Sequence, residues 1–288
     1  MNKTVQSSQI FDNPIEEVWT ALSDEKALKK WFFPVRDYKF EVGKEFWFYE
    51  NEDSSNYLHR CRFTEIIPDK LIAYSWEHPS HSKGKSLVTW EFEQQGNQTR
   101  LTLTHTGLET FADAGDDFKP ENFQFGWDNF VHDVLRLFLN GIEKLVFKIR
   151  IEAKPADIWK HMWDKEMYTK WTEPFCEGSY FEGELSVGKR IHFLSPSGGG
   201  MYSNVIYLKE NEQIIFQHIG EIVAFKEMLL DENTKKWTGS CEHYQLISSG
   251  NDTILRVEVD TDPKYFEFMQ MKFPLAMKRL KELIEVEK

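Results

Sequence analysis

The sequence has few cysteines and no long apolar run. Cys61, Cys176 and Cys241 are the only cysteines among its 288 residues. Because they are odd in number and far apart, they predict neither a disulfide framework nor a paired-cysteine metal knuckle. No segment approaches the ~18 consecutive apolar residues of a membrane span, and the first residues lack the apolar core of a signal peptide. We therefore expect a cytoplasmic protein with no membrane-inserted segment.

Positive charge is also scarce. The chain has 35 basic and 47 acidic residues, which gives a formal net charge of −12. Residues 1–142 contain 15 basic and 23 acidic residues, and residues 143–288 contain 20 and 24. Because neither half has an excess of cations, the composition argues against binding of nucleic acid or of an anionic membrane surface.

The sequence does contain a repeat of domain length. The segment EVGKEFWFYE at residues 41–50 has an echo in SVGKRIHFLS at residues 186–195. Neighbouring landmarks recur in the same order: a pair of tryptophans 12 residues apart (Trp19 with Trp31, Trp159 with Trp171) and a Gly-Asn hairpin dipeptide (Gly96-Asn97, Gly250-Asn251). A period this long exceeds any solenoid repeat. We therefore predict two tandem domains, residues 1–142 and residues 143–288.

The residue pattern predicts the same element order in each copy. In the first, a short strand precedes a helix that begins at Pro14, and a second short helix ends near Trp31. Residues 38–106 alternate between apolar and polar positions, as strands of an antiparallel sheet with one covered face do. The period then changes to 3.6 over residues 122–141, and again over residues 265–285. This order is typical of an α+β fold in which the last helix covers the sheet.

Several motifs of the first copy together resemble one known family. They are PIEEVWTAL, Trp31 with Pro34, VGKEFWF, PDKLIAYSW, VTWEFEQQGNQTRLTLTHTG and GWDNFVHDVL. The sequence resembles the START-related helix-grip superfamily (SRPBCC), and within it homologues of the carboxy-terminal domain of the Hsp-90 ATPase activator. The likeness covers nearly all of residues 5–141. The second copy lacks the Gly126-Trp127 and Thr104-His105 pairs and has an insertion around FKEMLLDENTKKW, so its ligand need not be shared.

The resemblance implies two tandem helix-grip (START-like) domains, each a curved antiparallel sheet wrapped around a long carboxy-terminal helix. In relatives, a cavity between sheet and helix often takes a hydrophobic small molecule, and we expect this function mainly in the first domain. Two alternatives remain: a protein-interaction module like the chaperone activator, or an enzyme of the cyclase, dehydratase or hydrolase type. The sequence identifies no catalytic residue and no cofactor.

Strand parity identifies candidate ligand-binding residues. Leu101, Leu103 and His105 point to the same side, as do Val88 and Trp90. A histidine that ends an apolar inward row is a candidate polar contact for a ligand. The alternative is a half-exposed strand end with the ring bonded to a backbone carbonyl. Trp76, Trp90 and Trp127 either stack on a flat ligand or belong to the core, and the same holds for Tyr49. The candidate ligand-binding residues are Tyr49, Trp76, Trp90, His105, Phe111, Phe123, Trp127 and Phe130.

Two further segments allow alternative interpretations. Residues 109–118 join the last strand to the long helix, so Phe111 and Phe118 either close a lid over a ligand or anchor a packed surface loop. Three histidines and a cysteine on or near neighbouring strands are candidate ligands of a metal site: His59, Cys61, His78 and His81. We do not expect one, because a zinc site needs four well-placed ligands and the second copy has no equivalent set.

Overall fold

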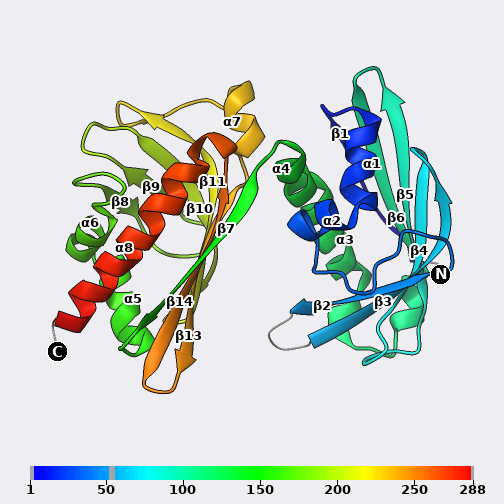
Figure 1. Cartoon of the computed structure of the whole chain (residues 1–288), viewed down its shortest axis with the longest axis horizontal. Coiled ribbons are helices and arrows are strands. Elements are labelled where there is room, and N and C mark those ends of the chain that lie inside the picture. The colour runs from blue at the N-terminus through cyan, green and yellow to red at the C-terminus, as the bar shows by residue number, and fades with distance from the viewer. Residues whose placement is uncertain (1–2, 52–55, 287–288) are drawn as a thin grey trace. The chain divides into compact units, whose positions relative to one another are not determined.

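The structure is a computed structural model that describes residues 3–51 and 56–286. Two compact units divide the chain between Leu139 and Asn140, whereas the repeat placed the boundary at residue 142 (Figure 1). Each unit is an antiparallel sheet with helices, so the predicted α+β fold of two helix-grip domains is confirmed. No described helix combines the length and the apolar character that a membrane crossing requires.

The first unit is a six-stranded antiparallel sheet with strand order β1-β6-β5-β4-β3-β2. Two short helices follow the first strand, and a continuous helical segment of three parts ends the unit. The strands are β1 Val5–Phe11, β2 Glu45–Asn51, β3 Asn56–Ile67, β4 Leu71–Glu77, β5 Ser86–Gln95 and β6 Gln98–Thr106. The helices are α1 Ile15–Ser23, α2 Glu25–Trp31, η1 Leu108–Phe111, η2 Asp116–Phe118, α3 Pro120–Asp128, the π-helical η3 Asn129–Val134 and α4 Leu135–Leu139.

The sheet of the first unit has one buried face. Along β5 the inward residues Val88 and Trp90 are buried, and along β6 Leu101, Leu103 and His105 are each 0% exposed. This is the inward row predicted from strand parity. The Gly96-Asn97 hairpin joins the two strands, with Gly96 at φ +66°, a backbone conformation that glycine adopts without strain.

The final helical segment of the first unit directs the predicted stripe at the core and buries two further positions. The sequence pattern placed Phe123, Trp127, Phe130, Val134, Leu137 and Phe138 on one stripe, and all six lie in the core or pack against it. The most deeply buried positions are Trp127 in α3, Val131 in η3 and Leu135 in α4, at intervals of four residues. A π-turn contains more residues than the 3.6 of an α-turn, so successive buried residues lie farther apart in the sequence.

The second unit repeats this element order with additions. Its strand order is β7-β14-β13-β11-β10-β9-β8, and β12 pairs with β11. The strands are β7 Glu143–Ile151, β8 Tyr180–Gly183, β9 Arg190–Leu194, β10 Gly200–Lys209, β11 Gln213–Val223, β12 Lys226–Glu227, β13 Cys241–Ser249 and β14 Asp252–Thr261. The helices are α5 Pro155–Trp163, α6 Lys165–Thr172, α7 Glu232–Trp237, η4 Pro263–Tyr265 and α8 Phe266–Val286. β12 and α7 lie in the insertion identified in the sequence.

The stripe predicted for α8 was wrong in its first half. Phe268, Met271 and Leu275 were placed in the core with Met277, Leu280 and Leu283, but the first three are 37%, 57% and 49% exposed. Figure 1 shows α8 lying across the second sheet. Phe273 sets its rotation, because its ring stacks on Phe147 of β7 at 4.9 Å. The residue pattern does not determine which face of α8 is buried, because the helix has apolar residues on several sides.

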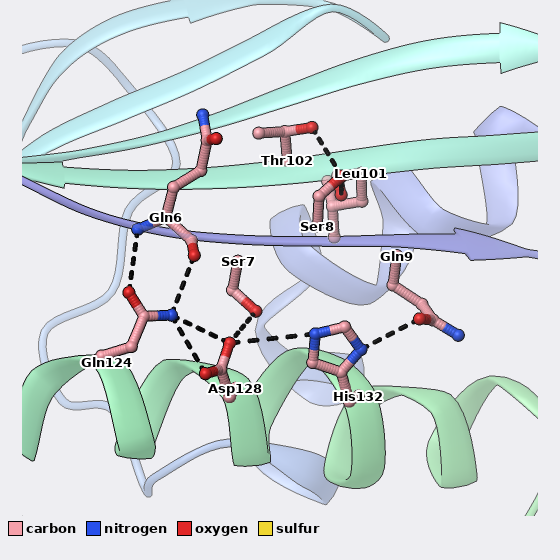
Figure 2. Close-up of polar contacts among 9 residues, drawn as sticks. All are labelled: Gln6, Ser7, Ser8, Gln9, Leu101, Thr102, Gln124, Asp128 and His132. Atoms are coloured by element: carbon pink, nitrogen blue, oxygen red, sulfur yellow. Dashed lines mark hydrogen bonds and ion pairs between the residues drawn. The ribbon is translucent and has the colours of Figure 1, made fainter.

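A polar clamp holds α3 and η3 against β1, the edge strand of the first sheet (Figure 2). The Gln124 amide accepts a hydrogen bond from the Gln6 backbone N–H at 3.2 Å and donates to the Gln6 carbonyl at 2.8 Å. Asp128 accepts from the Ser7 hydroxyl at 2.7 Å, and the His132 ring bonds the Gln9 side chain. The clamp covers part of an edge that is otherwise open to pairing with another chain.

We predict that Gln124→Ala lowers the free energy of unfolding of the first unit by about 1 kcal/mol, because two hydrogen bonds to the backbone of β1 are lost. The amide of Gln6 should exchange with solvent faster, and hydrogen exchange followed by NMR measures it. Gln94→Ala, which removes an exposed glutamine of β5, is the matched control. Unchanged exchange at Gln6 would show that the clamp does not protect this edge.

Candidate functional site

A cavity of about 350 Å³ lies between the inner face of β2, β3 and β4 and the helical segment α3–η3. This volume falls within the range of small-molecule sites. Most of its wall is aromatic, with polar groups at a few positions. The lining residues are Phe33, Glu50, Tyr57, His59, Trp76, His78, Asp117, Phe118, Asn122, Phe123, Gly126, Trp127 and Phe130.

Gly126 leaves part of the helical wall without a side chain. A Cβ atom built at this position would meet no atom within 4 Å. Trp127 and Phe130 come from the same segment and also line the cavity. Glycine inside a helix is less stabilising than alanine. Gly126 therefore lowers the stability of the helix locally and leaves the cavity wall open.

His59 and His78 place polar atoms in the aromatic wall. His59 is 6% exposed and His78 is 2% exposed. The His59 ring lies parallel to Phe48 with centroids 4.6 Å apart, and its centroid is 4.5 Å from that of His78. Among the described residues, no protein atom bonds either nitrogen of His59 or Nδ1 of His78. Buried polar atoms of this kind are rare in native proteins.

Both rings are neutral near pH 7. Burial lowers the pKa of His78 to about 4, with a smaller contribution from His81. Burial, assisted by His78, holds the pKa of His59 well below its usual value. The Trp76 Nε1–H donates to His78 Nε2 at 3.0 Å. The single proton of the neutral His78 ring therefore resides on Nδ1, which is a hydrogen-bond donor without a protein acceptor.

The mouth of the cavity is acidic. Glu50 and Asp117 both line it, and burial together with the charge of Asp117 raises the pKa of Glu50. The Tyr57 hydroxyl donates to Asp117 Oδ2 at 2.7 Å and ties β3 to η2 across the opening. Tyr57 has φ +53°, a strained conformation for an aromatic residue, and such strain concentrates at functional sites.

The structure brings four of the eight predicted site residues to the cavity: Trp76, Phe123, Trp127 and Phe130. Trp90 lies deeper and donates to the Tyr74 hydroxyl at 2.9 Å. Tyr49 contacts Trp47 and the Arg36 guanidinium, away from the cavity lining. Phe111 packs behind the wall against His78 and Phe123. Tyr49 lies on the outer face of β2, as its alternation with the buried Phe48 requires. Helix register and loop path decide which of the inward residues reach the cavity, and strand parity cannot supply either.

His105 lies behind the wall, where it anchors Trp127. It is 0% exposed, so the expectation of a half-exposed strand end was wrong. The Trp127 Nε1–H donates to His105 Nδ1 at 3.0 Å, and His105 Nε2 lies 2.7 Å from the Ser86 Oγ. Ser86 in turn donates to the Trp76 carbonyl at 3.2 Å. Burial lowers the pKa of His105 to about 3, so the neutral Nε2–H tautomer completes the chain.

The segment between β6 and α3 is packed. Phe111 is 1% exposed and Phe118 is 6% exposed, which matches the packed-loop alternative. Phe118 also lines the cavity, so this anchored loop contributes a wall. Within the described residues, no group of three or more His, Cys, Asp or Glu side chains has the arrangement of a metal site. Sequence reasoning considered His59 and His78 only as metal ligands and missed Gly126, Tyr57 and Asn122.

The second unit has a different polar cluster on its inner face. Ser203 Oγ lies 2.8 Å from His218 Nδ1, and His218 Nε2 lies 3.6 Å from a Glu242 oxygen. The Tyr244 hydroxyl donates to Glu242. Burial raises the pKa of Glu242 to about 7 and lowers that of His218 to about 4. The two units therefore differ in the chemistry of their interiors.

We predict that Glu242→Gln changes the pH dependence of the second unit's stability. A carboxyl whose pKa is raised by folding binds more protons in the folded state, so its contribution falls as the pH rises from about 4.5 to about 7. Relative to the native chain, the variant should gain about 1–3 kcal/mol between pH 5 and pH 8. Native-state hydrogen exchange of β11 and β13 measures this gain. Glu210→Gln, at an exposed turn, is the control, and equal pH profiles would contradict the assignment.

The first unit is similar to a known protein family. Residues 12–139 match the family model described as Activator of Hsp90 ATPase homolog 1-like protein. No curated protein matches the chain. The solved Aha1 dimer from Colwellia psychrerythraea is 22% identical, with 50% of this chain and 98% of that chain covered and a TM-score of 0.40.

Two other similar structures extend over both units. DynU16, from the dynemicin biosynthetic locus, is 13% identical, with 99% of this chain and 98% of that chain covered and a TM-score of 0.41. The di-domain ARO/CYC BexL from the BE-7585A biosynthetic pathway is 12% identical, with 98% and 97% covered and a TM-score of 0.41. The family match covers the unit that contains the cavity.

Proposed function

We propose that the first unit, whose residues 12–139 match the activator of Hsp90 ATPase homolog 1-like family model, is a helix-grip domain that binds a hydrophobic small molecule. The ligand occupies the cavity between β2–β4 and α3–η3. The observation that carries this proposal is the aromatic wall of a cavity of about 350 Å³, opened at Gly126.

The cavity suits an apolar ligand of two or three rings. Trp76 lines the cavity from the sheet, and Phe123 and Trp127 line it from α3. Burial of about 200 Å² of apolar ligand surface would contribute roughly 5 kcal/mol before the cost of association. The His105–Ser86 chain holds Trp127 in place, so the wall is formed before a ligand arrives and little ordering cost remains.

We predict that the neutral fluorescent probe N-phenyl-1-naphthylamine binds the native protein and that Gly126→Leu weakens its binding at least tenfold. The added side chain enters the open part of the wall without meeting another atom at its Cβ, so the variant should remain folded. Fluorescence titration measures both dissociation constants, and circular dichroism checks the fold.

Glu121→Leu is the matched control, because it adds the same side chain at an exposed position of α3. It should bind the probe as the native protein does. Equal binding to the native protein and to Gly126→Leu would place the probe elsewhere and remove the cavity as the ligand site.

A protein-interaction role is the second candidate, favoured by the family description and by one exposed aromatic residue. Phe125 on α3 is 78% exposed, next to the cavity residue Gly126. If the first unit acts on a chaperone, Phe125→Ser should reduce the stimulation of purified Hsp90 ATPase while probe binding persists. If ligand binding is the function, the native protein should leave the ATPase rate unchanged.

A further inference from the structure

The cavity contains a polar subsite that identifies the class of ligand. Three nitrogen atoms, both of His59 and Nδ1 of His78, are buried with no protein hydrogen-bond partner among the described residues. The two rings lie edge to face, at an interplanar angle of 66° with centroids 4.5 Å apart. Such atoms are costly to bury unless something bonds them, and both residues line the space that a ligand would fill.

The hydrogen-bonding capacity of this pair is fixed by its surroundings. Trp76 occupies the acceptor lone pair of His78, which leaves the His78 Nδ1–H as a donor. A neutral His59 offers one further donor and one acceptor. The subsite therefore presents two donors and one acceptor. One hydroxyl group can accept from the His78 Nδ1–H and donate to the unprotonated nitrogen of His59. The other His59 nitrogen points away across the ring and needs a second acceptor, such as a ketone oxygen.

We propose that His59 and His78 bind the oxygen of an uncharged aromatic alcohol or hydroxyketone whose rings occupy the aromatic part of the cavity. This inference rests on the proposed function, since it names the ligand class of the same site. The ring of such a ligand would lie among Trp76, Phe123 and Trp127, with its oxygen at the histidine pair.

The charge around the cavity argues for a ligand without an acidic group. Glu50 and Asp117 line the mouth and repel an anion. The other titratable group that lines the cavity is Tyr57, whose hydroxyl already donates to Asp117. No lysine or arginine lines the cavity among the described residues. A carboxylate or phosphate would thus lose its hydration without gaining a cation.

The test compares three matched probes: 2-naphthol, 2-methylnaphthalene and 2-naphthoate. They share the ring system and differ in the group offered to the histidine pair. Each displaces N-phenyl-1-naphthylamine in a fluorescence competition assay, so one readout serves the native protein and all variants. We expect the ratio of the dissociation constants of 2-methylnaphthalene and 2-naphthol to fall at least tenfold in His78→Phe and in His59→Phe. 2-Naphthoate should bind at least tenfold more weakly than 2-naphthol.

His81→Phe is the control, because this exposed histidine lies near the opening but does not line the cavity. It should leave the ratio unchanged. Retained binding of N-phenyl-1-naphthylamine shows that each variant is folded. The ¹⁵N shift of His78 Nδ1 gives a second readout, and it should move with 2-naphthol and stay in place with 2-methylnaphthalene.

Three outcomes would overturn the inference: an unchanged ratio in the histidine variants, an unmoved Nδ1 shift, or tighter binding of 2-naphthoate than of 2-naphthol. In each case the proposed function would still stand if the apolar probes bind and Gly126→Leu weakens their binding. If Gly126→Leu weakens the binding of no probe, the proposed function is refuted instead.

Discussion

The first unit depends on one chain of hydrogen bonds that crosses its interior from helix to sheet. Trp127 donates to His105, His105 to Ser86, and Ser86 to the Trp76 carbonyl, while the Trp76 indole donates to His78. Every link lies in the low-dielectric interior, where a hydrogen bond is strong and an unmade one is costly. The chain fixes the rotation of the helix over the sheet and the tautomers of two histidines. The cavity is thereby left with a defined shape and a defined donor.

The two units show how one fold accommodates different interiors. Both place a long carboxy-terminal helical segment on an antiparallel sheet. At the position aligned with His105, the second unit has Val259, which is 4% exposed and packs in the core. Its polar groups are instead Ser203, His218 and Glu242 on three neighbouring strands, where Ser203 bonds His218 and Glu242 lies 3.6 Å from it. The two units share the pattern of apolar residues that specifies the fold and differ in the polar residues inside it.

Much of the fold could be predicted from sequence, and about half of the site. The strand pattern gave the buried rows of β5 and β6, because alternation along a strand reports its faces directly. The buried faces of the helices were harder to predict. The predicted stripe of the first unit's last helical segment missed Val131 and Leu135, and Phe273 selected one of several apolar faces of α8. His59 and His78 were visible as neighbours, but only the position of α3 shows that they line a cavity. Such features depend on contacts between distant elements and leave no local signal.

The π-turn at Asn129–Val134 separates two parts of the last helical segment that do different work. Leu135 and the residues after it seat the segment on the core, whereas Phe123 and Trp127 shape the binding space. A π-turn takes up one residue more than an α-turn, so it absorbs an extra residue without rotating the helix on either side of it. Removing one residue here would restore ordinary α-helical winding and leave Trp127 and the anchor residues directed at the sheet. The irregular turn thus lengthens the segment by one residue while its binding part and its anchor keep the same orientation.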